Sequence, residues 1–229
     1  MLQISLFIIM KKEIIHSVIF FIYFIPLFLF PQDNDHQTWT NLELKYRYAE
    51  RVDFIFDGGL RFTDNSTLLS KYFFDFSMKR KCSNIFSFAL GIRPFFKKNN
   101  DLFFERSTRF YGDARFKRSI NKQMDFSVRT RIQTQIEEEF GFSENVKNKI
   151  REKVKLVYNL KDFDLDVFLS LELFYLFGES FEKVRYNMGL EKALIHNLNV
   201  NINYLVQNEF NTNPRELVFV LRSNIRYNF

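Results

Sequence analysis

The feature that most constrains this chain is an alternation of apolar and polar residues with a period of two, which begins near residue 38 and recurs to the carboxyl end. In the segment 123–137, for example, Phe126 and Ile132 alternate with Arg129 and Arg131. A period of two places successive side chains on opposite faces of a strand, whereas an amphipathic helix repeats every 3.6 residues. The chain is therefore predicted to be all-β, with long strands that have one apolar and one charged face.

The alternation divides the chain into eleven segments separated by turn-forming residues. The predicted strands are 38–49, 52–62, 69–79, 84–94, 103–118, 123–137, 147–159, 163–176, 182–194, 198–210 and 216–229. Short connections alternate with longer ones, at 63–68, 95–102, 138–146, 177–181 and 211–215. Short turns at one end and longer loops at the other are typical of transmembrane β-barrels. Every segment also exceeds the roughly 9 to 11 residues that a tilted strand needs to cross a bilayer.

The composition agrees with such a barrel. The chain contains 31 Phe, 10 Tyr and 1 Trp, yet 26% of its residues are charged. Rings and charges coexist if the apolar faces meet lipid and the charged faces line a lumen. We predict an antiparallel transmembrane β-barrel of 10 to 12 strands, with a secreted soluble β-protein as the alternative.

The number of strands follows from a general rule. Single-chain bacterial barrels have even numbers of strands, so eleven segments predict that one lies outside the barrel or that one was missed. The region before Trp39 is short, which favours ten strands plus an irregular amino-terminal piece over twelve.

The amino-terminal segment predicts export. An apolar block at 14–30 follows Lys11 and Lys12 and is followed by polar residues at 32–35. A basic start, an apolar centre and a polar exit are the marks of a secretory signal peptide. We predict a signal peptide at 1–31, with Met10 as an alternative start, and a barrel at 32–229 in the bacterial outer membrane. An uncleaved anchor is the alternative, although the block is slightly shorter than the roughly 20 residues of a spanning helix.

Other functional classes find little support. Cys82 is the only cysteine and the chain has three histidines, so we expect no disulfide, no metal site and no cofactor. The basic residues alternate with apolar ones and no phosphate-binding loop is present, so nucleic acid is not an expected partner. A lipid-modifying enzyme would need a catalytic histidine. Only His36, in the exit segment, and His196, in a predicted turn, qualify, so we predict no enzyme and keep the lipid-modifying enzyme as a less favoured alternative.

One group of polar residues lies at a similar distance along the strands from the predicted short turns. Its members fall on the charged face of their strands and lie 10 to 11.5 residues from the centre of the nearest predicted short turn. They are Arg61, Arg93, Arg109, Arg131, Arg151, Glu172, Arg185 and Gln207. We predict that they form a lumenal belt. The favoured interpretation is structural, with arginines bracing the wall through carboxylates, and the alternative is a narrow pore that favours anions.

The carboxyl end carries a separate signal. Tyr227 and the terminal Phe229 close a strand with apolar residues at alternating positions. This ending resembles the carboxyl-terminal assembly signature of bacterial outer-membrane barrels, which implies the barrel-insertion machinery and outer-membrane lipid as partners. No feature of the sequence sets the oligomeric state.

The wider pattern resembles a known family. Trp39 opens the first predicted strand, Arg61 ends the second, Arg109 and Arg131 lie on a central hairpin, and Arg151 opens the next strand. Glu172, Leu173 and Phe174 follow late in the eighth. Together these positions resemble the DUF2490 family of predicted outer-membrane proteins of the Bacteroidetes type, over residues 39–229. The resemblance implies an outer-membrane barrel of unknown function.

Overall fold

The described part of the chain consists of eleven strands and one short helix. The computed structural model describes residues 35–99, 103–139, 143–178, 181–210 and 216–229, so the predicted signal peptide at 1–31 lies outside the described residues. The strands are β1 (His36–Ala49), β2 (Val52–Thr63), β3 (Leu68–Lys81), β4 (Phe86–Lys98), β5 (Phe104–Ser119), β6 (Met124–Glu139), β7 (Ser143–Leu160), β8 (Leu165–Leu176), β9 (Phe181–Ile195), β10 (Leu198–Glu209) and β11 (Glu216–Asn228). The 3₁₀ helix η1 (Lys161–Phe163) joins β7 to β8, so β8 begins two residues later than predicted.

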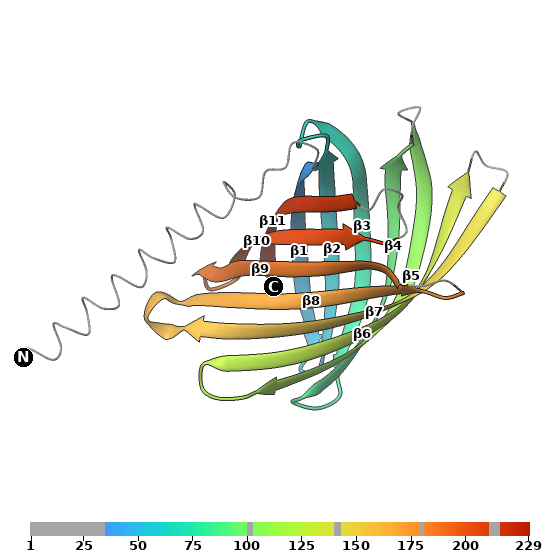
Figure 1. Ribbon diagram of the computed structural model, residues 1–229. Coiled ribbons are helices and arrows are strands. Elements are labelled where there is room, and N and C mark those ends of the chain that lie inside the picture. Colours follow the sequence, from blue (N-terminus) through green and yellow to red (C-terminus); the bar gives the residue numbers. More distant parts are fainter. Residues whose placement is uncertain (1–34, 100–102, 140–142, 179–180, 211–215) are drawn as a thin grey trace, which may run out of the picture. The chain divides into compact units, whose positions relative to one another are not determined.

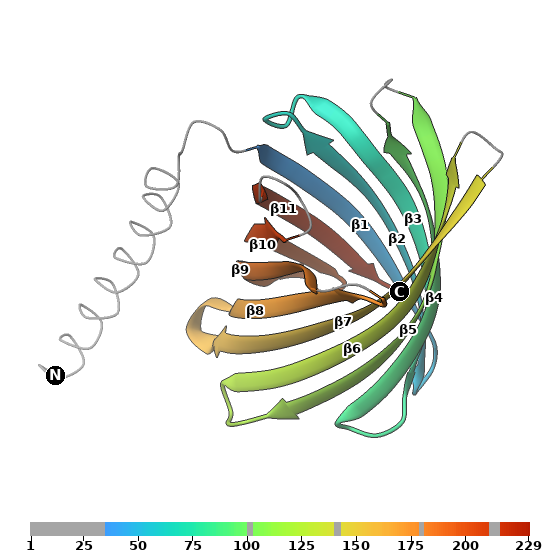
Figure 2. The same ribbon diagram turned by 45° about the vertical axis from the view of Figure 1, so that its right-hand side comes forward.

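The strands close into a barrel (Figures 1 and 2). Each strand pairs in an antiparallel manner with the next along the chain, and β1 pairs with β11 in parallel, from His36 opposite Phe219 to Lys45 opposite Asn228. Closure leaves no sheet edge whose backbone N–H and C=O groups would be unpaired in lipid. The fold class is confirmed.

The prediction of an even number of strands was wrong within the described residues. The segment that starts at His36 is a full strand and not an irregular piece, because it pairs with both β2 and β11. An odd number closes because β1 and β11 both start at the same end of the barrel and therefore run in parallel. The sheet was predicted to be wholly antiparallel. Among the described strands, only the seam between β1 and β11 departs from this prediction.

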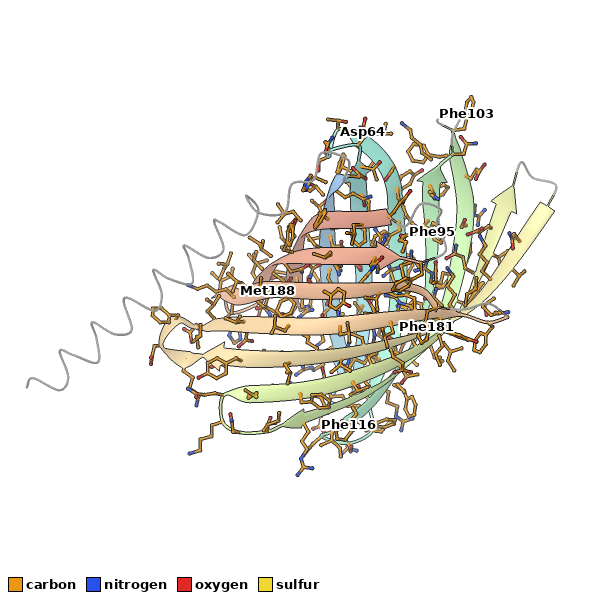
Figure 3. All side chains as sticks on the ribbon, in the orientation of Figure 1. Asp64, Phe95, Phe103, Phe116, Phe181 and Met188 are labelled. Carbon is orange, nitrogen blue, oxygen red and sulfur yellow. The ribbon has the colours of Figure 1, made fainter. Side chains whose placement is uncertain are left out.

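The barrel has two ends, which we name by their connections. The loop end is the end at which β2, β4, β6, β8 and β10 finish, and the turn end holds the connections 50–51, 82–85, 120–123, 161–164 and 196–197. Figure 3 places Asp64 and Phe103 at the loop end and Phe116 at the turn end. The predicted contrast in length is smaller than expected, because pairing of β6 with β7 continues to Glu139 opposite Ser143.

The outer face of the barrel is apolar and exposed. Leu90, Ile132 and Tyr186 expose 63%, 58% and 56% of their surface. Soluble proteins rarely expose an apolar surface of this extent. Aromatic pairs flank it at both ends, such as Tyr72 with Phe96 near the loop end, with ring centroids 4.7 Å apart. At the turn end, the centroids of Tyr227 and Phe229 lie 4.8 Å apart. Such girdles are a property of membrane barrels.

No helix among the described residues is long and apolar enough to span a membrane.

The inner face contains aromatic rings as well as charges, which corrects the expectation that the rings belong to the lipid side. The inward rings are buried and share the parity of the charged residues; they are Trp39, Phe73, Phe95, Tyr111, Phe168 and Phe174. Two glycines make room for close approach. A Cβ atom on Gly91 would lie 2.3 Å from the Tyr111 ring, and one on Gly189 would lie 2.3 Å from the Asn203 Cβ atom. The interior is therefore packed in part and not simply filled with solvent.

Candidate functional site

The lumen contains a cavity of about 720 Å³, whose lining residues come from the loop-end half and the middle of the barrel. Fourteen basic and seven acidic side chains line it. The basic ones are Arg61, Lys71, Arg93, Lys97, Arg109, Arg129, Arg131, Lys147, Lys149, Arg151, Lys153, Lys183, Arg185 and Arg222. Charged residues closer to the turn end, such as Glu43, Asp53 and Arg226, do not line it. The cavity is therefore electropositive.

The structure brings all eight predicted belt residues to this cavity: Arg61, Arg93, Arg109, Arg131, Arg151, Glu172, Arg185 and Gln207 all line it. Arg185 Nε donates a hydrogen bond of 2.6 Å to Gln207 Oε1. The strand register accounts for their grouping, because Glu172 lies opposite Arg185, and Arg185 opposite Gln207, across neighbouring strands.

Several lining residues were not identified from the sequence. Lys71 has the parity of the belt arginines and a similar distance to its turn, so its position could have been predicted by counting lysines as well. Arg222 lies on the last strand, which no turn follows, so the same measure does not apply to it. Arg129 lies two residues from Arg131 on the same face, so its distance from the short turn falls below the range that defines the belt.

One carboxylate at the middle of the lumen binds several arginines. Glu172 Oε1 accepts hydrogen bonds from Arg129 Nη2 at 2.6 Å and Arg151 Nη2 at 2.7 Å. Arg185 Nη1 lies 3.9 Å from Glu172 Oε2. Glu172 and Arg151 are buried. Because a buried charge is tolerated only when it is paired, this cluster holds β6, β7, β8 and β9 together.

A second set of polar contacts joins β3, β4, β5 and β6, beside the Glu172 cluster. Arg131 donates two hydrogen bonds to Asp113, of 2.6 and 2.7 Å, in a bidentate arrangement. Arg93 Nε donates to Asp75 Oδ2 at 2.5 Å, and the Tyr111 hydroxyl donates to Asp75 Oδ1 at 2.6 Å. Bidentate arginine–carboxylate pairs are among the strong hydrogen bonds of proteins. These pairs connect side chains of four strands on the inner face of the barrel.

The turn-end half of the lumen is also paired. Arg226 lies 2.6 Å from Glu43 and 3.3 Å from Glu191. Asp53, which is almost fully buried, lies 3.3 Å from Lys45. In this half the charges largely compensate each other within the protein.

The cavity also contains cations that no carboxylate neutralises. Among the described residues, six lining cations have no ion pair: Arg61, Lys71, Lys97, Arg109, Lys153 and Arg222. Two of these cations, Arg61 and Lys71, contact neutral rings. The Arg61 Cζ atom lies 4.0 Å from the centroid of the Trp39 ring, and Lys71 Nζ lies 3.5 Å from that of Phe95. A cation over a ring face is attracted by the ring quadrupole without any opposite charge.

The aromatic rings are shared between cations. Arg185 also contacts Trp39, at 5.2 Å, and Arg109 also contacts Phe95, at 5.3 Å. Phe73 lies between Arg93 at 4.2 Å and Arg61 at 5.6 Å. The rings therefore space the like charges around the lumen.

The histidines give no support to a catalytic site. His36 is the first residue of β1 and stacks on Phe219 at 5.5 Å between ring centroids, so the expectation that it belongs to an irregular exit segment was wrong. His196 is exposed in the connection between β9 and β10, at the opposite end of the barrel. Within the described parts of the chain, no group of three or more His, Cys, Asp or Glu side chains is placed to hold a metal ion.

The predicted assembly signal lies at the turn end. Phe229 exposes 65% of its surface, and its backbone N–H donates to the Lys45 carbonyl at 2.8 Å. Tyr227 lies opposite Leu44 in the seam between β1 and β11. The two aromatic side chains are therefore presented on the outer face of the closing strand.

The fold and the cavity together define a closed β-barrel with an electropositive lumen. The chain belongs to the family described as "Protein of unknown function (DUF2490)", whose model matches residues 36–218. The resemblance stated from the sequence is confirmed.

One solved structure with a TM-score above 0.5 shows the same kind of fold, and two porins are also similar. The β-domain of the Bordetella autotransporter Brka has a TM-score of 0.53 at 7% identity, with 80% of this chain and 86% of that chain covered. The NanC porin has a TM-score of 0.49 at 10% identity, with coverage of 75% and 86%. The KdgM porin has a TM-score of 0.47 at 13% identity, with coverage of 75% and 88%. No curated protein matches the chain.

Proposed function

We propose that this protein is an outer-membrane β-barrel whose lumen admits small anions from the loop end. The observation that carries the proposal is the cavity lining, in which basic side chains outnumber acidic ones by two to one and six cations have no ion pair. Rings of arginine and lysine side chains produce anion selectivity in pores. The exposed apolar outer face with aromatic residues near both ends supports placement in a membrane.

The short turns and Phe229 support one orientation of the proposed barrel in the membrane. In a bacterial outer-membrane barrel the short turns face the periplasm. Phe229 lies at the turn end, where the insertion machinery would read it as an assembly signal, so the cavity would open to the outside. A cleaved signal peptide at 1–31 would supply the export that this location needs. Membrane fractionation with heat-modifiable gel mobility tests the location, and a soluble protein without a mobility shift would contradict it.

The proposed selectivity arises from uncompensated charge. A cation with a carboxylate close by adds less to the field in the lumen than a cation without one. Arg61 and Lys71, in contrast, interact with neutral rings and have no carboxylate within ion-pair distance among the described residues. They lie opposite each other on β2 and β3, so their fields add on one wall.

The proposal is tested by ion selectivity in planar lipid bilayers. The full-length protein, inserted under a KCl gradient, is expected to give a reversal potential closer to the equilibrium potential of chloride than to that of potassium. Combined Arg61→Glu and Lys71→Glu substitutions should move this potential toward the potassium side, because four units of charge change on one wall of the lumen.

A matched double variant on the outer face, Arg118→Glu with Lys192→Glu, changes the net charge equally and should leave the reversal potential unchanged. Both residues are exposed, near the turn end. Absence of any conductance would refute ion flow through the lumen, and an equal shift in both double variants would refute the role of Arg61 and Lys71 in anion selectivity.

A further inference from the structure

Three of the unpaired cations lie together on one wall of the cavity. Arg61, Lys71 and Arg109 come from β2, β3 and β5, and we call them the three-cation pocket. Arg61 lies opposite Lys71 in the strand register. Lys71 Nζ and the Arg109 Cζ atom contact the same Phe95 ring, at 3.5 and 5.3 Å. No described carboxylate lies within ion-pair distance of any of the three.

The hydrogen-bond donors of this pocket are largely unused. Arg109 Nη2 donates to Gln135 Oε1 at 2.7 Å, but its Nε atom is buried without an acceptor. Arg61 lies 4.0 Å from the Trp39 ring. A guanidinium stacked on a ring contacts it with its flat face, so its N–H groups point sideways and stay available. The rings therefore hold the cations at the wall of the cavity without the use of a carboxylate.

A comparison with the neighbouring arginines shows what is missing. Arg131 uses its fork on Asp113, and Arg93 uses its Nε on Asp75. Both lie over a ring as well, Arg131 at 3.6 Å from Tyr111 and Arg93 at 4.2 Å from Phe73. The three-cation pocket repeats this arrangement of cation and ring but lacks the oxyanion.

We infer that the three-cation pocket is a binding site for a phosphate group, either free or on a small solute. Three positive charges exceed what one carboxylate neutralises, whereas a phosphate group carries roughly two negative charges near neutral pH. Its oxygens point in several directions and can accept hydrogen bonds from side chains of three strands at once. The inference rests on the proposed function, because the ligand must enter the lumen.

The test is calorimetric titration of inorganic phosphate into the refolded full-length barrel in detergent micelles. Arg61→Gln, Lys71→Gln and Arg109→Gln should each weaken phosphate binding at least about tenfold, because each removes a charge-assisted hydrogen bond. Arg115→Gln is the matched control. Arg115 shares the inward parity of β5 and has no ion pair among the described residues, but it lies nearer the turn end and does not line the cavity.

Two further measurements sharpen the test. Acetate should bind at least about tenfold more weakly than phosphate to the unsubstituted protein, because it presents one charge and one plane. Arg109→Lys should retain more affinity than Arg109→Gln, since it keeps the charge and loses only the fork. Heat-modifiable mobility of each variant shows that the barrel has folded.

Several results would overturn the inference. They are no phosphate binding by the unsubstituted protein, equal binding of acetate and phosphate, or an equal loss of affinity in Arg115→Gln. The calorimetry does not depend on ion flow. Phosphate binding without conductance would therefore support the pocket and refute the pore, whereas anion-selective conductance without phosphate binding would do the reverse.

Discussion

The two halves of the lumen are built from the same residue types and use them differently. Toward the turn end, cations such as Arg226 meet carboxylates directly, at 2.6 Å in the case of Glu43. Toward the loop end, cations such as Arg61 and Lys71 meet aromatic rings. Ion pairs brace the wall and cancel the field, whereas cations over rings leave the field uncancelled. The number of charged residues therefore does not decide whether a lumen is braced by ion pairs or left electropositive. The position of each carboxylate relative to the cations decides it.

The sequence shows how this placement arises. On β2, β3 and β5 a carboxylate and a cation stand four residues apart on the inward face, as Asp57 with Arg61 and Asp113 with Arg109. Four residues of a strand span about 13 Å, which is too far for an ion pair. The carboxylates instead take arginines from a later strand, as Asp113 takes Arg131 on β6 and Asp57 takes Arg93 on β4. Among the described residues, the cations on the loop side of β2, β3 and β5 are left without a carboxylate partner.

The largest expected effect concerns the paired part of the lumen. Glu172→Gln leaves Arg129 and Arg151 buried without their shared carboxylate, so the free energy of unfolding should fall by about 3 to 5 kcal/mol. Urea unfolding in lipid vesicles measures it, with the fluorescence of Trp39, the only tryptophan, as the signal. Glu138→Gln is the control. Its pair with Arg106, at 3.9 Å, is exposed on both sides, so its loss should cost less than about 1 kcal/mol. Equal costs would contradict the role of Glu172 as a brace.

The next prediction sets the two kinds of cation against each other. Asp113→Asn removes the carboxylate of the buried Arg131 and should destabilise the barrel by about 3 kcal/mol. Arg61→Met removes a cation that repels its neighbours and has no ion pair, so stability should stay unchanged or rise by up to about 1 kcal/mol. The same unfolding assay compares both variants. A loss of several kcal/mol in Arg61→Met would show that the unpaired cations also brace the wall.

A smaller effect is expected where ring packing supports the ion pairs. Gly91→Ala would place its Cβ atom 2.3 Å from the Tyr111 ring, whose hydroxyl binds Asp75, and should cost about 1 to 3 kcal/mol. Gly112→Ala is the matched control, because its Cβ atom would lie an ordinary 3.5 Å from Leu90. Its free energy of unfolding should change by less than about 1 kcal/mol. If the two variants are equally stable, Tyr111 is not held against the wall as described.

The smallest effect is a difference in salt dependence. Raising KCl from 0.1 to 1 M shortens the Debye length from about 10 to about 3 Å, so unpaired charges that face the cavity are screened. The anion preference in bilayers should therefore weaken. The unfolding midpoint should move little over the same range, because buried ion pairs are screened much less. An unfolding midpoint that falls together with the anion preference would show that charges in both halves of the lumen are screened alike.

Much of the fold could be predicted because the period of two survives in every strand. All eleven strands and the inward parity of the belt follow from it. The inward rings were missed for a physical reason. Phe73 is followed by Phe74 and Phe95 by Phe96, so both faces are aromatic there and the alternation gives no contrast. Ion-pair partners were also hidden, because Arg151 and Glu172 meet through strand pairing and not through their distance in the sequence.

The parallel seam has a consequence for assembly. Hairpin turns set the register of the other ten strand contacts, but no turn joins β1 to β11, so side chains must select the register of closure. Glu43 lies opposite Arg226 there, and their atoms are 2.6 Å apart. A slip by one residue would turn every side chain to the wrong face. A slip by two would set Arg226 against Lys45 or Asn41. This ion pair therefore fixes the register in which β1 pairs with β11.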